Sequence, residues 1–277
     1  MSTKQKTWWW IGGALIILYC LFPIAWIVSL SFKTTADLAN KQFLPSQWTW
    51  ENYSTILTGS ASGLFLPSLR NSFGICLIAT FISCVLAMFA AYAIARLDFP
   101  GKRLILSTAL AVAIFPVISI VTPLFNLWRQ VGLYDTWPGL IIPYLSLTLP
   151  ISIWTMSAFF REIPWEMEQA AQVDGATTWQ AFRKVIVPLA APGVFTTAII
   201  AFFIAWNDFA YGISLTSTSA ARPVPAALGL FSGASQFQDP TGAIAAAAVI
   251  VTIPVVVLVL IFQRRIVAGL TNGAVKG

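Results

Sequence analysis

Long runs without a charged residue alternate with short polar segments along this 277-residue chain. Six strongly apolar runs contain 23 to 26 residues each, and they cover 7–32, 71–95, 104–128, 136–160, 185–207 and 240–263. An α-helix rises about 1.5 Å per residue, so ~20 apolar residues cross the ~30 Å hydrocarbon core of a bilayer. An open strand would leave backbone groups unpaired in lipid. The pattern therefore predicts an all-α integral membrane protein with six transmembrane helices.

The whole chain, 1–277, is expected to form a single transmembrane domain. We expect spans at about 8–32, 70–95, 104–128, 136–160, 186–214 and 240–263. The first run exceeds the ~7–15 apolar residues of a signal peptide, so it is expected to be an uncleaved span. Prolines within the spans can kink helices and allow gating, although proline is common in such helices; they are Pro116, Pro123, Pro143, Pro150 and Pro254.

Basic residues fix the expected orientation of the spans. With both termini inside, the inner segments carry 11 Lys and Arg residues and the outer segments carry 5. Because cytoplasmic loops carry an excess of Lys and Arg, this distribution predicts that both termini are cytoplasmic. It makes 33–69 an extracytoplasmic loop, 161–185 a cytoplasmic loop and 264–277 a cytoplasmic tail.

Composition supports a multi-pass protein of the cell membrane and excludes several kinds of chemistry. Apolar residues make up 58% of the chain and charged residues 9%, whereas soluble proteins have about 45–50% and ~25%. The chain has no histidine, so catalysis by a His base and imidazole metal sites are excluded. Cys20, Cys76 and Cys84 form no CxxC pair and are expected to pack as small apolar residues. The scattered basic residues give no nucleic-acid signal, and we expect no catalytic or metal site.

The segment 161–185 is the most charged part of the chain. Pro164 suits the first position of a helix, Glu166 suits its positive end, and Gly175 suits a left-handed terminator. A short helix over about 164–174 is therefore expected, followed by a turn. Taken on composition alone, an ordinary amphipathic connector at the membrane surface explains this segment as well.

The sequence EQAAQVDGA at 168–176, followed by Phe182 and by VPL at 187–189, resembles the EAA loop of ABC-importer permeases. The family pattern is EAA, three residues and Gly, then a spaced apolar residue and Pro. This chain departs from it at Gln169, where the family usually has Glu.

Other segments extend the resemblance over nearly the whole chain. They are WENY at 50–53, NSF at 71–73, ARLDFPGK at 95–102 and the tail GLTNGAVKG at 269–277, which is similar to the end of maltose-type permeases. FREIPW at 160–165 and AFRKVIVP at 181–188 narrow the likeness to the permeases of actinobacterial trehalose importers.

The resemblance implies the type I ABC importer permease fold and a role in sugar import, with trehalose as the expected disaccharide. It implies a heterodimer with a second permease, an ABC ATPase dimer below and an extracytoplasmic substrate-binding lipoprotein or protein above. The implied ATPase-coupling residues are Glu168, Gln169, Ala170, Ala171, Asp174, Gly175, Arg183 and Lys276. The chain contains no GxxxxGK[ST] motif, so no cofactor is expected in this chain, and ATP and Mg would be bound by the partner ATPase.

Asp208 is the main candidate for a buried ionisable group, because an intramembrane carboxylate is costly and marks a pathway or a paired site. With Trp206 and Asn207 it offers an aromatic face and polar groups to a sugar, so we expect these residues, with Asn71 and Asn126, along the translocation pathway. Two alternatives stay open: Asp208 can be a solvated residue at a helix end, and so can Asn126, which lies at the end of the third span.

An ion-coupled secondary transporter of a small solute is the alternative function. Such a transporter usually has several buried acids, and this chain offers one candidate, Asp208. An intramembrane enzyme would lack a pair of catalytic acids, and a purely structural subunit leaves the EAA-like segment unexplained.

Overall fold

The computed structural model describes residues 3–40, 42–231 and 240–274, with side chains for 5–40, 42–231 and 240–262. Its regular elements are helices throughout, and no strand occurs in these ranges. They are α1 (Thr3–Ser31), α2 (Thr35–Leu38), α3 (Glu51–Leu57), α4 (Ser62–Arg96), α5 (Lys102–Ala113), α6 (Val117–Val131), α7 (Trp137–Glu162), α8 (Trp165–Val173), α9 (Thr178–Ala181), the π-helical turn η1 (Phe182–Ile186), α10 (Val187–Leu189), α11 (Ala191–Trp206), α12 (Ala210–Leu215), α13 (Val224–Leu230) and α14 (Thr241–Ala274).

Four helices are long and apolar enough to cross a membrane by themselves: Gln5–Ser31, Ser62–Arg96, Trp137–Glu162 and Thr241–Phe262. Two further helix pairs are long and apolar enough only when each pair is taken together. Both pairs bend sharply, by 86° between α5 and α6 and by 71° between 178–189 and α11. The described chain therefore has four such helices, or six if each bent pair is one span.

Proline explains both bends. Pro116 directly precedes α6, and Pro188 and Pro192 flank the second break. A proline has no N–H for the helical ladder, and its ring clashes with the preceding turn. Pro123, Pro143, Pro150 and Pro254, by contrast, lie inside continuous helices.

The chain divides into two compact units, which are described separately. Unit 1 contains residues 1–67 and 227–254, and unit 2 contains 68–226 and 255–277. In unit 1, the loop expected at 33–69 contains α2 and α3. Asn52 joins the end of α1 to the start of this loop, because its side-chain amide donates hydrogen bonds to the carbonyls of Ser31 and Lys33, at 3.0 and 2.8 Å.

Two charged side chains are buried in this loop of unit 1. The ammonium of Lys33 donates to the carbonyl of Gln42 at 2.6 Å and lies 5.2 Å from the ring centre of Trp26. The carboxylate of Asp37 accepts hydrogen bonds from the hydroxyl and the backbone N–H of Ser46, both at 2.8 Å, and these bonds hold its pKa below the ordinary value. The loop is thus an ordered structure tied by its own polar groups.

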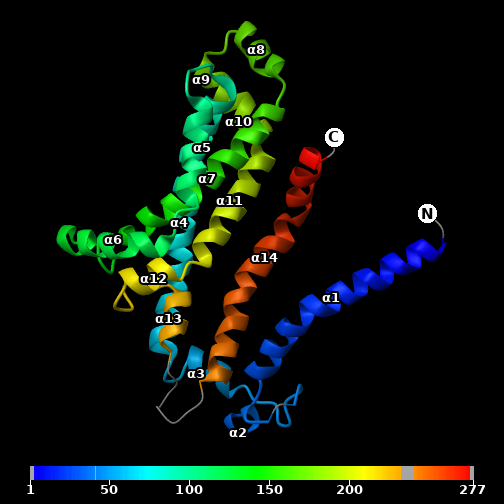
Figure 1. The fold of residues 1–277 in the computed structure, drawn as a ribbon, viewed down its shortest axis with the longest axis vertical. Helices are drawn as coiled ribbons and strands as arrows, with labels where there is room; N and C mark the ends of the chain where they lie inside the picture. The colour runs from blue at the N-terminus through cyan, green and yellow to red at the C-terminus, as the bar shows by residue number, and fades with distance from the viewer. Residues whose placement is uncertain (1–2, 41, 232–239, 275–277) are drawn as a thin grey trace. The chain divides into compact units, whose positions relative to one another are not determined.

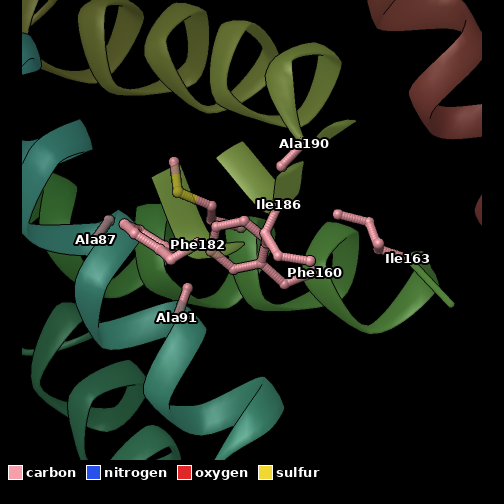
Figure 2. Packing of buried hydrophobic residues seen from close by; sticks show 8 residues of the cluster. Ala87, Ala91, Phe160, Ile163, Phe182, Ile186 and Ala190 are labelled. Carbon is pink, nitrogen blue, oxygen red and sulfur yellow. The ribbon is translucent and has the colours of Figure 1, made fainter. Parts of the chain in front are cut away.

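In unit 2, α7 packs against α5 and α11, and α6 packs against α12. Within this unit, α8 and α9 lie at one end of α4, α5 and α7, whereas α6 and α12 lie toward the other end (Figure 1). A buried apolar cluster holds the first of these ends together, and Figure 2 shows Phe182 and Ile186 of η1 meeting Phe160 of α7. Its members are Ala87, Ala91, Met156, Phe160, Ile163, Phe182, Ile186 and Ala190. The small Ala87 and Ala91, one turn apart on α4, let the aromatic rings approach that helix closely.

Candidate functional site

The segment between α7 and α11 folds as the sequence predicts at its centre. The expected helix over 164–174 is observed as α8, Trp165–Val173, with Pro164 directly before it. Gly175 has φ +91°, and the N–H of Ala176 returns to the carbonyl of Ala171 at 2.9 Å. The left-handed conformation of Gly175 allows this N–H to bond a carbonyl that the helix end would otherwise leave free, which confirms the predicted glycine terminator.

A second short helix then leads the chain back into the bundle. Thr177 and Gln180 form a reciprocal capping box at the start of α9, which pairs two free N–H groups. η1 follows directly, with Phe182 buried beneath Trp179 and Phe89. Pro188 offers no N–H to the carbonyl four residues before it, so the α-helical ladder is interrupted next to this π turn.

Glu168 is the buried residue of α8, at 3% exposure. One of its carboxylate oxygens accepts a hydrogen bond from the hydroxyl of Tyr92, and the other lies 3.8 Å from Nε of Arg96. Arg96 also donates to the carbonyl of Ile163 at 2.7 Å, and its guanidinium lies 5.0 Å from the ring centre of Trp165. The carboxylate and the guanidinium therefore fasten α8 to the end of α4.

Sequence reasoning missed Tyr92 and Arg96 as partners of this segment. Their spacing carried a signal, because residues four apart lie on the same face of a helix. The sequence could not show that this face meets Glu168, 72 residues further along the chain than Arg96.

Most of the other residues expected to couple to an ATPase are exposed on α8 or after it. Ala171 is half-buried. Those that are exposed are Gln169, Ala170, Asp174, Gly175 and Arg183. Val173 and Met167, at 87% and 44% exposure, add apolar surface to the same segment. The result is an exposed, mixed apolar and polar surface, which we call the α8 surface (residues 167, 169, 170 and 173–175). Lys276 lies outside the described residues.

Three of the residues expected along a pathway, Trp206, Asn207 and Asp208, lie where α11 ends and α12 begins. Trp206 is buried, with Phe73 at 5.0 Å and Phe202 at 5.2 Å between ring centres. Asn207 is exposed, and its amide donates to the carbonyl of Phe203 at 2.8 Å. Of the three, Trp206 therefore packs and Asn207 offers polar surface.

Asp208 is half-buried, and its carboxylate caps α12. It accepts hydrogen bonds from the backbone N–H groups of Gly212 at 3.0 Å and Tyr211 at 3.5 Å. The buried hydroxyl of Tyr144, a residue that sequence reasoning did not single out, also lies close to this carboxylate. A carboxylate at a helix N-terminus is favourable, so the cap stabilises a charged group at this position.

The two asparagines do not share the surroundings of Asp208. Asn71 is buried, donates to the carbonyls of Ser219 and Arg222 at 2.9 and 3.1 Å, and accepts from the indole of Trp137 at 3.1 Å. Asn126 is exposed on α6, the helix that packs against α12. Asn71 thus ties the loop after α12 to α4, while Asn126 remains available at a surface.

No group of three or more Cys, Asp and Glu residues that could hold a metal ion occurs in the described part of the chain. The geometry of the two regions described above is that of packing and helix capping, with exposed apolar and polar side chains on α8.

Comparison with known proteins identifies a transport family. A family model described as "Binding-protein-dependent transport system inner membrane component" matches residues 83–272. The chain is 56% identical over 277 residues to the trehalose transport system permease protein SugB of Mycobacterium tuberculosis, and this match covers 100% of both chains. It is 37% identical to the trehalose/maltose transport system permease protein MalG of Thermococcus litoralis, over 96% of this chain and 95% of that relative. It is 40% identical to the sulfoquinovosyl glycerol transport system permease protein SmoH of Agrobacterium fabrum, over 96% and 93% of the two chains.

Solved structures show the same fold. A chain of a bacterial ABC transporter involved in the import of the acidic polysaccharide alginate has a TM-score of 0.78 at 23% identity, over 95% of this chain and 98% of that one. A chain of the MetNI methionine ABC transporter has a TM-score of 0.59 at 20% identity, over 74% and 96%. The helical architecture is therefore that of ABC importer permeases.

Proposed function

Because the chain belongs to the inner membrane components of binding-protein-dependent transport systems, it is a membrane transport subunit and not an enzyme, and we propose that it is the permease of an ATP-driven sugar importer. With a second permease it forms the translocation pathway, and its substrate is the disaccharide trehalose. One observation carries this proposal: the 56% identity to a trehalose transport permease extends over both chains from end to end. Family membership disfavours an ion-coupled secondary transporter.

The α8 surface is the proposed contact with the ATPase. Its exposed apolar residues, Met167 and Val173, suit a protein partner, and Gly175 sets the direction in which the chain leaves the helix. Glu168 was expected to contact the ATPase, but its side chain faces α4. We assign it to transmission: a displacement of α8 by the ATPase passes through Glu168 and Arg96 to the end of α4.

Asn207 and Asp208 are the proposed polar residues of the pathway, ahead of Trp206. An exposed amide and a half-buried carboxylate offer both hydrogen-bond donors and an acceptor to sugar hydroxyls. Asn126, exposed on the helix beside α12, is the next candidate. Asn71 is assigned to positioning the loop 219–222.

The remaining assembly follows from the same proposal. Both termini and the 161–185 segment face the cytoplasm, where ATPase subunits bind ATP and Mg, and an extracytoplasmic binding protein delivers the sugar. Positively charged residues support this orientation, with 11 on the proposed inner side against 5 outside. The tail, including Lys276, is proposed to reach the ATPase dimer.

Uptake of labelled sugar by a deletion strain tests the proposed function. The strain lacking this permease should lose trehalose uptake, and the wild-type gene should restore it. The same strain carrying Gly175→Val provides an inserted but poorly coupled control. Unchanged trehalose uptake after deletion would overturn the substrate, and loss of labelled maltose uptake in its place would redirect it to another disaccharide.

A further inference from the structure

A cavity of about 490 Å³ lies in unit 2, close to the ends of α4 and α7 and the beginning of α5. Three basic residues line it: Lys102 and Arg103 from the first turn of α5, and Arg161 from the last turn of α7. Its other lining residues are Ile94, Ala95, Leu106 and Ser107. The cavity thus combines a cationic rim with an apolar wall.

The positive charge around this cavity is poorly balanced by the protein. Lys102 forms an ion pair with Asp98 at 3.3 Å. Arg103 and Arg161 are exposed, and no carboxylate among the described residues lies within 4.0 Å of either, Glu162 included. Two of the three cations therefore lack an ionic partner in this part of the chain.

The start of α5 adds to the imbalance. The first turn of this 12-residue helix contains no acidic residue, and Gly101, which precedes it, provides no side-chain cap. Lys102 and Arg103 therefore stand at the positive end of the helix, where a negative group would be favoured. An external anion in the cavity would interact favourably with the helix end and with both unpaired arginines.

We propose that this cavity binds the phosphodiester headgroup of an anionic membrane lipid. The cavity lies where two membrane-spanning helices end, α4 at Arg96 and α7 at Glu162, which is the level of headgroups in a bilayer. Beside it on α5, Leu104 and Ile105 are 70% and 56% exposed, so they offer apolar surface to acyl chains. Basic pockets between membrane helices on the cytoplasmic side bind lipid headgroups of this charge. The location in the inner leaflet rests on the orientation given under the proposed function, whereas the binding itself does not.

Native mass spectrometry of the detergent-purified permease, with the subunits that co-purify, tests this inference. Phosphatidylglycerol and cardiolipin should bind more tightly than phosphatidylcholine. The double variant Arg103→Gln, Arg161→Gln should weaken the binding of phosphatidylglycerol about 30-fold, or about fivefold for each basic residue removed. The control Arg70→Gln, Arg129→Gln removes the same charge from two exposed arginines elsewhere, and it should leave binding unchanged.

Three results would overturn the proposal. One is equal binding of anionic and zwitterionic lipid, and another is an equal loss in the test and control variants. The third is binding of inorganic phosphate in the cavity with no preference for the lipid, which would identify a free anion as the ligand. Because the measurement requires no transport, failure of the trehalose assignment would leave the lipid result intact, and failure of lipid binding would leave the uptake result intact.

Discussion

Two carboxylates of unit 2, Glu168 and Asp208, both stand at the start of a short helix yet serve different purposes. Glu168 is 3% exposed and lies against a buried arginine of another helix. Asp208 is half-buried and accepts hydrogen bonds from N–H groups of the helix that it precedes. The first carboxylate therefore joins two distant segments, whereas the second stabilises a local turn and keeps part of its surface free.

The comparison teaches how an acidic side chain acquires its role in this protein. Burying a carboxylate is unfavourable unless a cation or several donors compensate it. In α8 the compensation comes from α4, so this carboxylate ties the two helices together. At α12 the compensation comes from nearby backbone N–H groups, so the carboxylate is held in place without a salt bridge.

The largest expected effect comes from Glu168→Ala. Arg96, with 5% of its side chain exposed, would remain charged without its ionic partner, which costs about 3–5 kcal/mol in buried pairs. The purified complex should show a lower Tm, and uptake should be lost. Replacing both partners, Arg96→Met with Glu168→Leu, should restore much of the Tm. Unchanged Tm with lost ATPase binding would instead make Glu168 a direct contact.

Gly175→Val should have the next largest effect. A left-handed conformation costs an L-residue roughly 1–2 kcal/mol, and a β-branched side chain fits it poorly. Uptake and substrate-stimulated ATP hydrolysis should fall while the protein still inserts. Gly132→Val is the matched control, because Gly132 has φ +76° and open space around it but lies at the end of α6. If both variants lose uptake equally, general strain and not the α8 turn explains the effect.

Asp208 variants should produce a smaller and separable effect. Asp208→Asn retains a capping oxygen and removes the charge, whereas Asp208→Ala also loses the cap, worth about 1 kcal/mol. If the carboxylate binds sugar, both variants should raise the KM for uptake about tenfold, since a hydrogen bond to a charged group contributes about 1.5 kcal/mol. Normal uptake in Asp208→Asn, with reduced protein abundance in Asp208→Ala, would limit this residue to capping.

Gln169→Ala should change stability least. Gln169 is exposed on α8, and exposed substitutions usually alter the free energy of unfolding by less than about 0.5 kcal/mol. Its Tm should match that of the wild type, while the affinity for the ATPase subunit, measured by titration, should decrease. A large loss of Tm would place Gln169 in the same structural role as Glu168 and remove the contrast between the two faces of α8.

The length of the apolar runs, the charge distribution and a short motif predicted much of the fold. They indicated a helical membrane protein, the position of α8 and the left-handed glycine after it, and the resemblance to trehalose importer permeases, which the comparisons confirm. The positions of the helix breaks could not be predicted from the sequence. Prolines occur in five expected spans or span ends, yet Pro116 accompanies an 86° bend while Pro143 and Pro150 lie inside α7.

These successes share a local physical cause: hydrophobic length, a capping residue and backbone strain at a glycine depend on residues close together in the chain. The contact partner of a polar side chain, by contrast, depends on residues far apart in the chain. From the sequence, Glu168 and Gln169 were both expected to contact the ATPase, and Asp208 was expected along the pathway. Tertiary packing alone decided that Glu168 turns toward Arg96, that Gln169 remains exposed and that Asp208 caps a helix, because the energy of each polar group is set by what compensates it after the chain has folded.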